Sequence, residues 1–122
     1  MLIRASEARR SETPAGVMTT LASPTQGGAE RAIWRVEGKP GAAGPLHSVD
    51  VEQLWAFLDG EAVVELGEES YAVGSGDTVV MPGGVLRRLT AGQAGFTAVV
   101  TAAAGARASA GGKDFGVPPW IA

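Results

Sequence analysis

Turns that contain glycine and proline divide this chain into short apolar runs, and this division constrains the fold more than any other feature. The 122 residues include 18 glycines and 7 prolines. Turn signals stand, for example, at Gly67-Glu68, Gly74-Ser75-Gly76 and Pro82-Gly83-Gly84. The runs between such turns recur about every 8 to 12 residues and show no helical period. The pattern therefore predicts an all-β fold of the sandwich or barrel type.

The apolar runs give the positions of the expected strands. We predict strands at residues 17–22, 33–36, 47–58, 62–66, 71–73, 78–81, 85–89 and 96–101. Prolines on either side of the first run favour a strand at a sheet edge, where proline is tolerated. Asp59-Gly60 is expected to form a hairpin turn that leads residues 62–66 back onto the long strand 47–58, because these residue types readily supply positive φ. A further turn is expected at Ala91-Gly92.

Composition and charge restrict the class of protein. A chain of this length forms one domain with one core. The net charge of -3 and the pI near 5.1 give no electrostatic reason to expect nucleic acid or an anionic membrane as a partner. The sequence has no apolar run near the length of about 20 residues that spans a bilayer, no apolar signal-peptide core and no cysteine. We expect a cytoplasmic protein without disulfides, thiolate chemistry or a cofactor.

Two stretches carry a spaced set of glycine, proline and histidine residues. In residues 41–60, Gly41 is followed after five residues by His47, the single histidine of the chain. Gln53 stands six positions after His47, and Gly60 follows after six more residues. Residues 76–91 begin with a glycine and contain a proline and a second glycine six and eight positions later. This skeleton resembles the two conserved motifs of the cupin family. The resemblance covers residues 31–101 and implies a single-domain, cupin-type jelly-roll β-barrel.

The side chains at the metal-ligand positions differ from those that the resemblance implies. Cupins take a metal from two histidines and a glutamate in the first motif and a histidine in the second, and here these positions are His47, Val49, Gln53 and Arg87. The asparagine late in the second motif is Ala91. Transition-metal sites usually need three or four protein ligands, and this set offers at most two. We therefore predict that the purified protein holds no stoichiometric metal.

The ends of the chain lie outside the resemblance. Residues 1–30 form an N-terminal arm with the edge strand, and residues 31–101 form the barrel. Within residues 102–122, the Ala- and Gly-rich stretch up to Lys113 is expected to be mobile. The bulky apolar groups from Phe115 to Ile121 are expected to dock as a tail on the barrel.

Strand alternation divides the side chains between two faces of the barrel wall. With His47 inward, as the resemblance implies, period two places Val49, Gln53, Trp55 and Phe57 on the same inner face. The second motif then places Met81 and Arg87 across the barrel. We expect one cavity lined by these residues with His47 at its polar end, suited to a flat or apolar ligand with a carboxylate or carbonyl. The alternatives are that the aromatic residues, with Trp34, are plain core and that Arg87 extends to solvent.

The opposite face of the same strand becomes apolar halfway along. Leu54, Ala56 and Leu58 share this outer face. An exposed apolar face of this kind is typical of an interface. We expect a homodimer to which this face and residues 17–22 contribute. The alternative is that a loop or the C-terminal tail covers the face.

Three functions from different classes fit these residues. In the first, the protein is a metal-independent isomerase, cyclase or epimerase that acts on a small organic acid or polyketide-like compound. His47 would move a proton, and Arg87 with Gln53 would stabilise an oxyanion or bind a carboxylate. The second is a non-catalytic module that binds or senses a small molecule. The third is a metallocupin oxygenase or isomerase with atypical ligands. Three observations would distinguish these functions. Activity that survives chelation would support the first, saturable binding without turnover the second, and stoichiometric metal in the purified protein the third.

Overall fold

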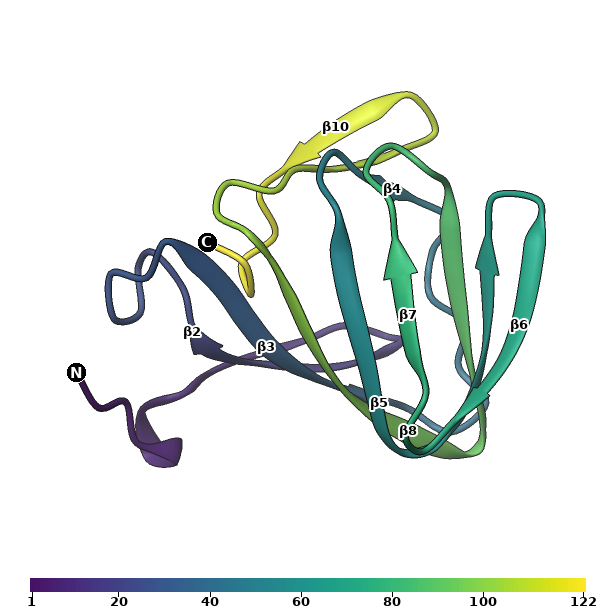
Figure 1. Cartoon of the computed structure of the whole chain (residues 1–122), viewed down its shortest axis with the longest axis horizontal. Coiled ribbons are helices and arrows are strands. Elements are labelled where there is room, and N and C mark those ends of the chain that lie inside the picture. Colours follow the sequence, from purple (N-terminus) through teal and green to yellow (C-terminus); the bar gives the residue numbers. More distant parts are fainter.

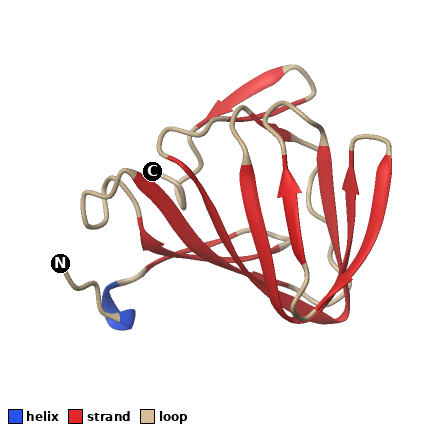
Figure 2. Cartoon of the chain, in the orientation of Figure 1, coloured by secondary structure: helices blue, strands red, loops and turns tan.

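The computed structural model describes all 122 residues, and it confirms the all-β class and the jelly-roll architecture. There is no α-helix, only a short 3-10 turn η1 at Ala5–Glu7 (Figures 1 and 2). The strands are β1 Arg9–Glu12, β2 Gly16–Ala22, β3 Arg31–Gly38, β4 Ser48–Val49, β5 Gln53–Leu66, β6 Glu69–Gly74, β7 Thr78–Met81, β8 Arg87–Ala103, β9 Ala108–Ala110 and β10 Lys113–Gly116. No helix has the length and apolarity needed to cross a membrane.

Two long strands, β5 and β8, form the middle of the barrel and pair antiparallel along their whole lengths. The first half of β5 pairs with the second half of β8, and its other neighbour there is β7. The second half of β5 pairs with the first half of β8 and with β6. The sheet order is β1-β2-β3-β8-β5-β6, and a small sheet β10-β9-β4 lies beside it. Because β5 and β8 both bend, one continuous sheet curls into the barrel seen in Figure 1.

The predicted hairpin at Asp59-Gly60 is wrong, because β5 continues through it. The pairing with β8 shifts register between Phe57 and Asp59 and again between Gly60 and Ala62, which marks bulges. Gly60 does have positive φ, +75°, and a side chain there would collide with the main chain of Gly95. Gly60 therefore allows β5 to bend within a continuous strand. The turn expected at Ala91-Gly92 is likewise part of continuous β8.

The long strand predicted at residues 47–58 is interrupted. Only Ser48–Val49 forms a strand before the chain leaves the ladder, and β5 begins at Gln53. The carboxylate of Asp50 accepts a hydrogen bond from the main-chain N–H of Arg107 at 2.8 Å, and the N–H of Asp50 donates to the carbonyl of Arg107 at 3.0 Å. β4 pairs with β9, near the C-terminus. This long-range pairing breaks the strand at a place where its apolar pattern continues.

The N-terminal arm contributes two strands. Strand β2 lies between β1 and β3, so the expectation that residues 17–22 form the edge strand is wrong. The edge is β1, which is polar throughout and therefore carried no apolar signal.

The C-terminal residues return to the inner side of the barrel. The stretch 102–113 contains the end of β8, strand β9 and the start of β10. Beyond it, Ile121 is buried to 1% exposure. The main-chain oxygen of Trp120 accepts a hydrogen bond from Thr20 at 2.8 Å. The oxygen of Ala122 accepts hydrogen bonds from Arg9 at 2.9 Å and Ser23 at 2.6 Å. The tail is therefore attached to the N-terminal arm.

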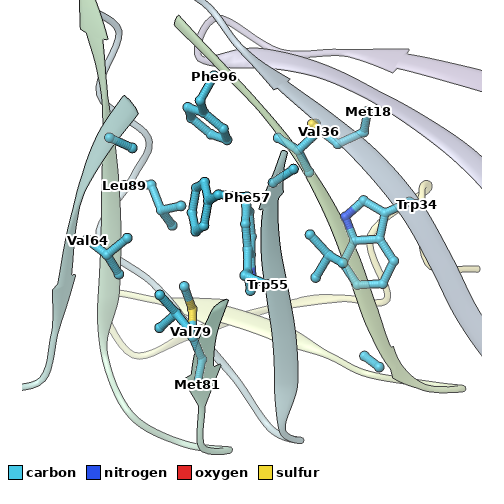
Figure 3. Packing of buried hydrophobic residues seen from close by; sticks show 14 of the residues in the cluster. Met18, Trp34, Val36, Trp55, Phe57, Val64, Val79, Met81, Leu89 and Phe96 are labelled. Atoms are coloured by element: carbon cyan, nitrogen blue, oxygen red, sulfur yellow. The ribbon is translucent and has the colours of Figure 1, made fainter. Parts of the chain in front are cut away.

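The core lies between the curled halves of the sheet (Figure 3). Phe57 is at its centre, with its ring 6.0 Å from that of Trp55 and 5.4 Å from that of Phe96. These aromatic contacts, from β5 and from the bend of β8, hold the two bent strands together. Burial of a side chain as large as Phe57 stabilises the fold by about 1.5–3 kcal/mol.

Candidate functional site

One side of the barrel contains a cavity of about 610 Å³. This volume lies within the range of small-molecule sites, about 300–1,000 Å³. Strands β2 and β3 and the start of β5 form much of its wall, and residues 117–121 of the C-terminal tail line it as well. Its larger apolar side chains are those of Met18, Trp34, Val36, Val49, Trp55, Leu89, Phe96, Phe115, Val117, Trp120 and Ile121.

No charged side chain lines the cavity. Among its lining residues there is no Asp, Glu, Lys or Arg, and the polar side chains are those of Thr13, His47, Gln53 and Ser109. A charged ligand group would lose its hydration in such a place without a direct partner of opposite charge. The polar groups on the cavity wall are therefore uncharged or weakly basic: one imidazole, one amide, two hydroxyls and the indole N–H groups.

His47 is held in one tautomer. Its Nδ1 lies 2.8 Å from the carbonyl oxygen of Pro45, and because a carbonyl only accepts, Nδ1 carries the proton. In the neutral ring, Nε2 then has a free lone pair. Burial lowers the pKa of His47; the hydrogen bond to Pro45 raises it and the charge of Arg87 lowers it further, and the net direction is downward. His47 is therefore set as a neutral base near physiological pH.

Gln53 is fixed by two donors on one atom. Its Oε1 accepts from the indole Nε1 of Trp55 at 3.1 Å and from Nη1 of Arg87 at 3.3 Å. Because both bonds use the oxygen, the amide NH₂ group is directed away from them. This group makes no hydrogen bond within the chain, and it is not fully enclosed by protein. Gln53 is thus a donor on the cavity wall.

Arg87 is completely buried, with 0% exposure. Its Nε donates to the carbonyl of Val85 at 3.1 Å, and its Nη2 donates to the carbonyls of Pro82 at 2.9 Å and Val85 at 3.0 Å. No carboxylate pairs with it. Burial lowers the pKa of the guanidinium, but arginine keeps its proton in proteins. The residue places a positive charge behind Gln53 and ties the turn between β7 and β8 to the barrel.

The structure brings together only part of the predicted site. His47, Val49, Gln53 and Trp55 line the cavity. The side chains of Phe57, Met81 and Arg87 do not reach it and lie in the wall behind. The prediction that all of them line one cavity is therefore wrong for three residues. The reason for Arg87 is that its donors are satisfied by the carbonyls of its own turn, a contact that strand alternation does not predict.

Several lining residues were missed because they come from outside the two motifs. The tail residues Phe115 and Trp120 and the β2 residue Met18 are the main ones. The bulky apolar character of Phe115 and Trp120 predicted that the tail docks on the barrel. The location of the docking site depended on the pairing of β2 with β3 and on the return of the tail.

The family model for the cupin domain matches residues 34–101, more than half of the chain. The chain belongs to the cupin family. No curated protein matches the sequence.

Solved structures with the same fold include an oxalate decarboxylase, a vicilin and a protein of unknown function. Oxalate decarboxylase of Bacillus subtilis has a TM-score of 0.69 and is 22% identical over 79% of this chain, which covers 27% of that chain. Vicilin from hazelnut, Corylus avellana, has a TM-score of 0.69 at 17% identity, with 81% of this chain and 32% of that chain covered. A conserved protein of unknown function from Streptococcus pyogenes has a TM-score of 0.63 at 24% identity, with 75% and 76% covered. This cupin thus spans about a third or less of the length of the first two proteins, and at these identities the likeness shows the fold alone.

The residues at the cupin ligand positions do not fit a metal. Val49 has no donor atom, and the Gln53 oxygen that could bind a cation already accepts hydrogen bonds from Trp55 and Arg87. The guanidinium at the fourth position repels a cation. Nowhere do three His, Asp or Glu side chains group where a metal could bind.

Proposed function

We propose that this cupin binds a small organic molecule in the 610 Å³ cavity and, without a metal, catalyses an isomerisation, cyclisation or epimerisation with His47 as acid and base. The observation that carries the proposal is the tautomer of His47. Its Nδ1 proton is committed to Pro45, which leaves Nε2 as a basic lone pair on an uncharged, largely apolar wall.

The residues on this wall suit proton transfer next to a carbonyl. Nε2 of His47 would take a proton from the carbon beside a carbonyl, and the electron pair of the broken C–H bond would move onto the carbonyl oxygen. The amide NH₂ of Gln53 would donate to this developing oxyanion. Return of the proton from Nε2 to another carbon completes an isomerisation, and its return to the opposite face of the same carbon completes an epimerisation. In a cyclisation, the carbanion attacks a second carbonyl, and the alkoxide that forms takes the proton back from Nε2. General base catalysis of this kind contributes about 10²–10⁴-fold.

Arg87 supports this chemistry through Gln53. Its Nη1 bond to Gln53 Oε1 polarises the amide and makes the NH₂ group a stronger donor. Arg87 is thus a positioning residue, whereas the sequence predicted direct contact with the ligand.

Hydrogen exchange on a simple ketone tests the proposal without knowledge of the natural substrate. The probe is 2-tetralone in D₂O, with α-hydrogen loss followed by NMR. We expect saturable acceleration by the native protein that EDTA leaves unchanged. The variant His47→Asn keeps a donor for Pro45 but has no basic nitrogen, and we expect it to lose about 100-fold or more of the acceleration. Equal rates for the two proteins, both folded, would refute the role of His47.

A non-catalytic binding or sensing module is the second candidate. It is favoured by the fact that His47 is the only ionisable side chain on the cavity wall, so no second acid or base is present to assist it. Saturable binding of 2-tetralone without faster exchange would support this function over the first.

A further inference from the structure

Two buried side chains direct unpartnered hydrogen-bond donors into the cavity. We infer that the ligand is an uncharged, flat molecule with a carbonyl oxygen that Trp34 and Gln53 recognise. This inference rests on the proposed binding of a small molecule in the same cavity and narrows its chemical class.

Trp34 supplies the first donor. The residue is 1% exposed, lies in β3 and lines the cavity, yet its indole N–H has no acceptor in the chain. Buried tryptophan N–H groups usually find a partner. The only fully enclosed side-chain polar atom without a partner is Nε of Arg9, so the indole nitrogen of Trp34 reaches the space of the cavity. Figure 3 shows this nitrogen on the edge of the ring nearer Trp55.

Gln53 supplies the second donor. It is 4% exposed, and its oxygen is occupied by Trp55 and Arg87. The free NH₂ group cannot exchange places with the oxygen, because a flipped amide would direct its own donors at those of Trp55 and Arg87. Both free groups are therefore permanent donors, and the complementary ligand group is an acceptor.

The acceptor is uncharged. No lining residue carries a charge, and burial favours the neutral form of His47. Arg87 is close, but its guanidinium is bonded to Pro82, Val85 and Gln53 and does not line the cavity. A carboxylate would lose its water without a direct ionic partner. The sequence predicted a ligand with a carboxylate or a carbonyl, and of these two groups the cavity favours the carbonyl.

The flat shape follows from the aromatic side chains on the wall. Five of them line the cavity, namely Trp34, Trp55, Phe96, Phe115 and Trp120. Rings of this kind favour offset or edge contacts with another aromatic system. Two of the five come from C-terminal residues, Phe115 in β10 and Trp120 in the tail, so the ligand would contact aromatic surface on that side as well.

Three probes of one shape test the inference: 9-fluorenone, fluorene, which lacks the carbonyl, and fluorene-9-carboxylate, which is an anion. Binding is measured by titration calorimetry at pH 7.5. We expect 9-fluorenone to bind about tenfold or more tightly than either of the others, because hydrogen bonds to uncharged groups are worth about three- to tenfold each.

Variants assign the preference to the two donors. Trp34→Phe removes the N–H and keeps a ring, and Gln53→Glu keeps the oxygen that binds Trp55 and Arg87 but replaces the free donor. Each variant is expected to weaken the binding of 9-fluorenone by about three- to tenfold and to leave the binding of fluorene unchanged. Thr13→Val is the matched control, because the Thr13 hydroxyl on the same wall already donates to Gly16, and it should change neither.

The outcomes separate the two proposals. If fluorene or the carboxylate binds as tightly as the ketone, or if Trp34→Phe and Gln53→Glu both leave 9-fluorenone unchanged, the carbonyl assignment is overturned while small-molecule binding stands. If none of the three probes binds, the proposed function and the ligand class both fail.

Discussion

At the scale of single residues, the replacements at the metal positions form a connected unit. Arg87 and His47 pair through their main chains: the N–H of His47 donates to the carbonyl oxygen of Arg87, and the N–H of Arg87 donates to that of His47, with nitrogen-to-oxygen distances of 3.0 and 2.8 Å. From there the side chains diverge, His47 to the cavity wall and Arg87 to the turn behind it. Gln53 connects the two regions, because its oxygen faces Arg87 and its amide nitrogen faces the cavity.

Replacement of Arg87 by methionine is expected to destabilise the protein by about 2–4 kcal/mol. The change leaves the carbonyls of Pro82 and Val85 without donors, since no other group bonds them from that side. Urea unfolding measures the effect. Arg88→Met, at the half-buried neighbour on the opposite face, is the control and should change stability by no more than about 0.5 kcal/mol; equal losses in both variants would contradict the prediction.

The single histidine gives the fold a defined pH dependence. Because burial lowers the pKa of His47 in the folded state, the unfolded chain binds the proton more readily. The stabilising effect of neutral His47 is fully present above the unfolded pKa, about 6.5, and is lost as pH falls toward the folded pKa. We expect the melting temperature of the native protein to fall more steeply than that of His47→Asn between pH 7.5 and pH 5. Parallel curves in circular dichroism would show that His47 does not titrate in this way.

At the scale of elements, the tail of residues 117–122 lines one side of the cavity and is fixed by the N-terminal arm. Thr20 and Ser23 hold the main-chain oxygens of Trp120 and Ala122. The double variant Thr20→Val and Ser23→Ala is expected to lose about 1–3 kcal/mol of stability and to release 9-fluorenone about five- to tenfold faster, because the aromatic cover of the cavity is loosened. Stopped-flow tryptophan fluorescence measures the release. Thr25→Val, which removes an exposed contact to the same oxygen, is the milder control, and an unchanged release rate in the double variant would show that the tail does not limit exit.

At the scale of the whole molecule, one sheet face remains uncovered. Leu58 and Val80 are 54% and 53% exposed on the outer side of β5 and β7, and Leu54 pairs with Val80 there. The tail occupies the inner side, so the alternative that it covers this face is wrong.

We therefore keep the proposal that a second copy of the chain covers this face. Sedimentation at micromolar concentration is expected to show a dimer for the native protein and a monomer for Val80→Lys, because a buried lysine without a partner opposes association. Val63→Lys, at an exposed position in the other half of β5, should remain dimeric. A monomeric native protein at that concentration would refute the proposed dimer.

The sequence determined the class of fold, because turn residues and short apolar runs act locally and were sufficient to predict all-β structure. The spacing of glycine, proline and histidine residues then indicated the cupin motifs. The sequence also determined which side chains of β5 face inward, since alternation separates the two faces and the cupin resemblance, with His47 inward, indicates the inner one. Only the tertiary structure decided that β5 and β8 each run through a predicted turn, because a positive φ at Gly60 serves a bulge as well as a hairpin. Tertiary structure likewise decided that Arg87 turns from the cavity to the carbonyls of its own turn, and that Trp34 and the tail complete the cavity wall. These last contacts join residues about 100 positions apart in sequence, such as Thr20 and Trp120, and no local pattern encodes such pairs.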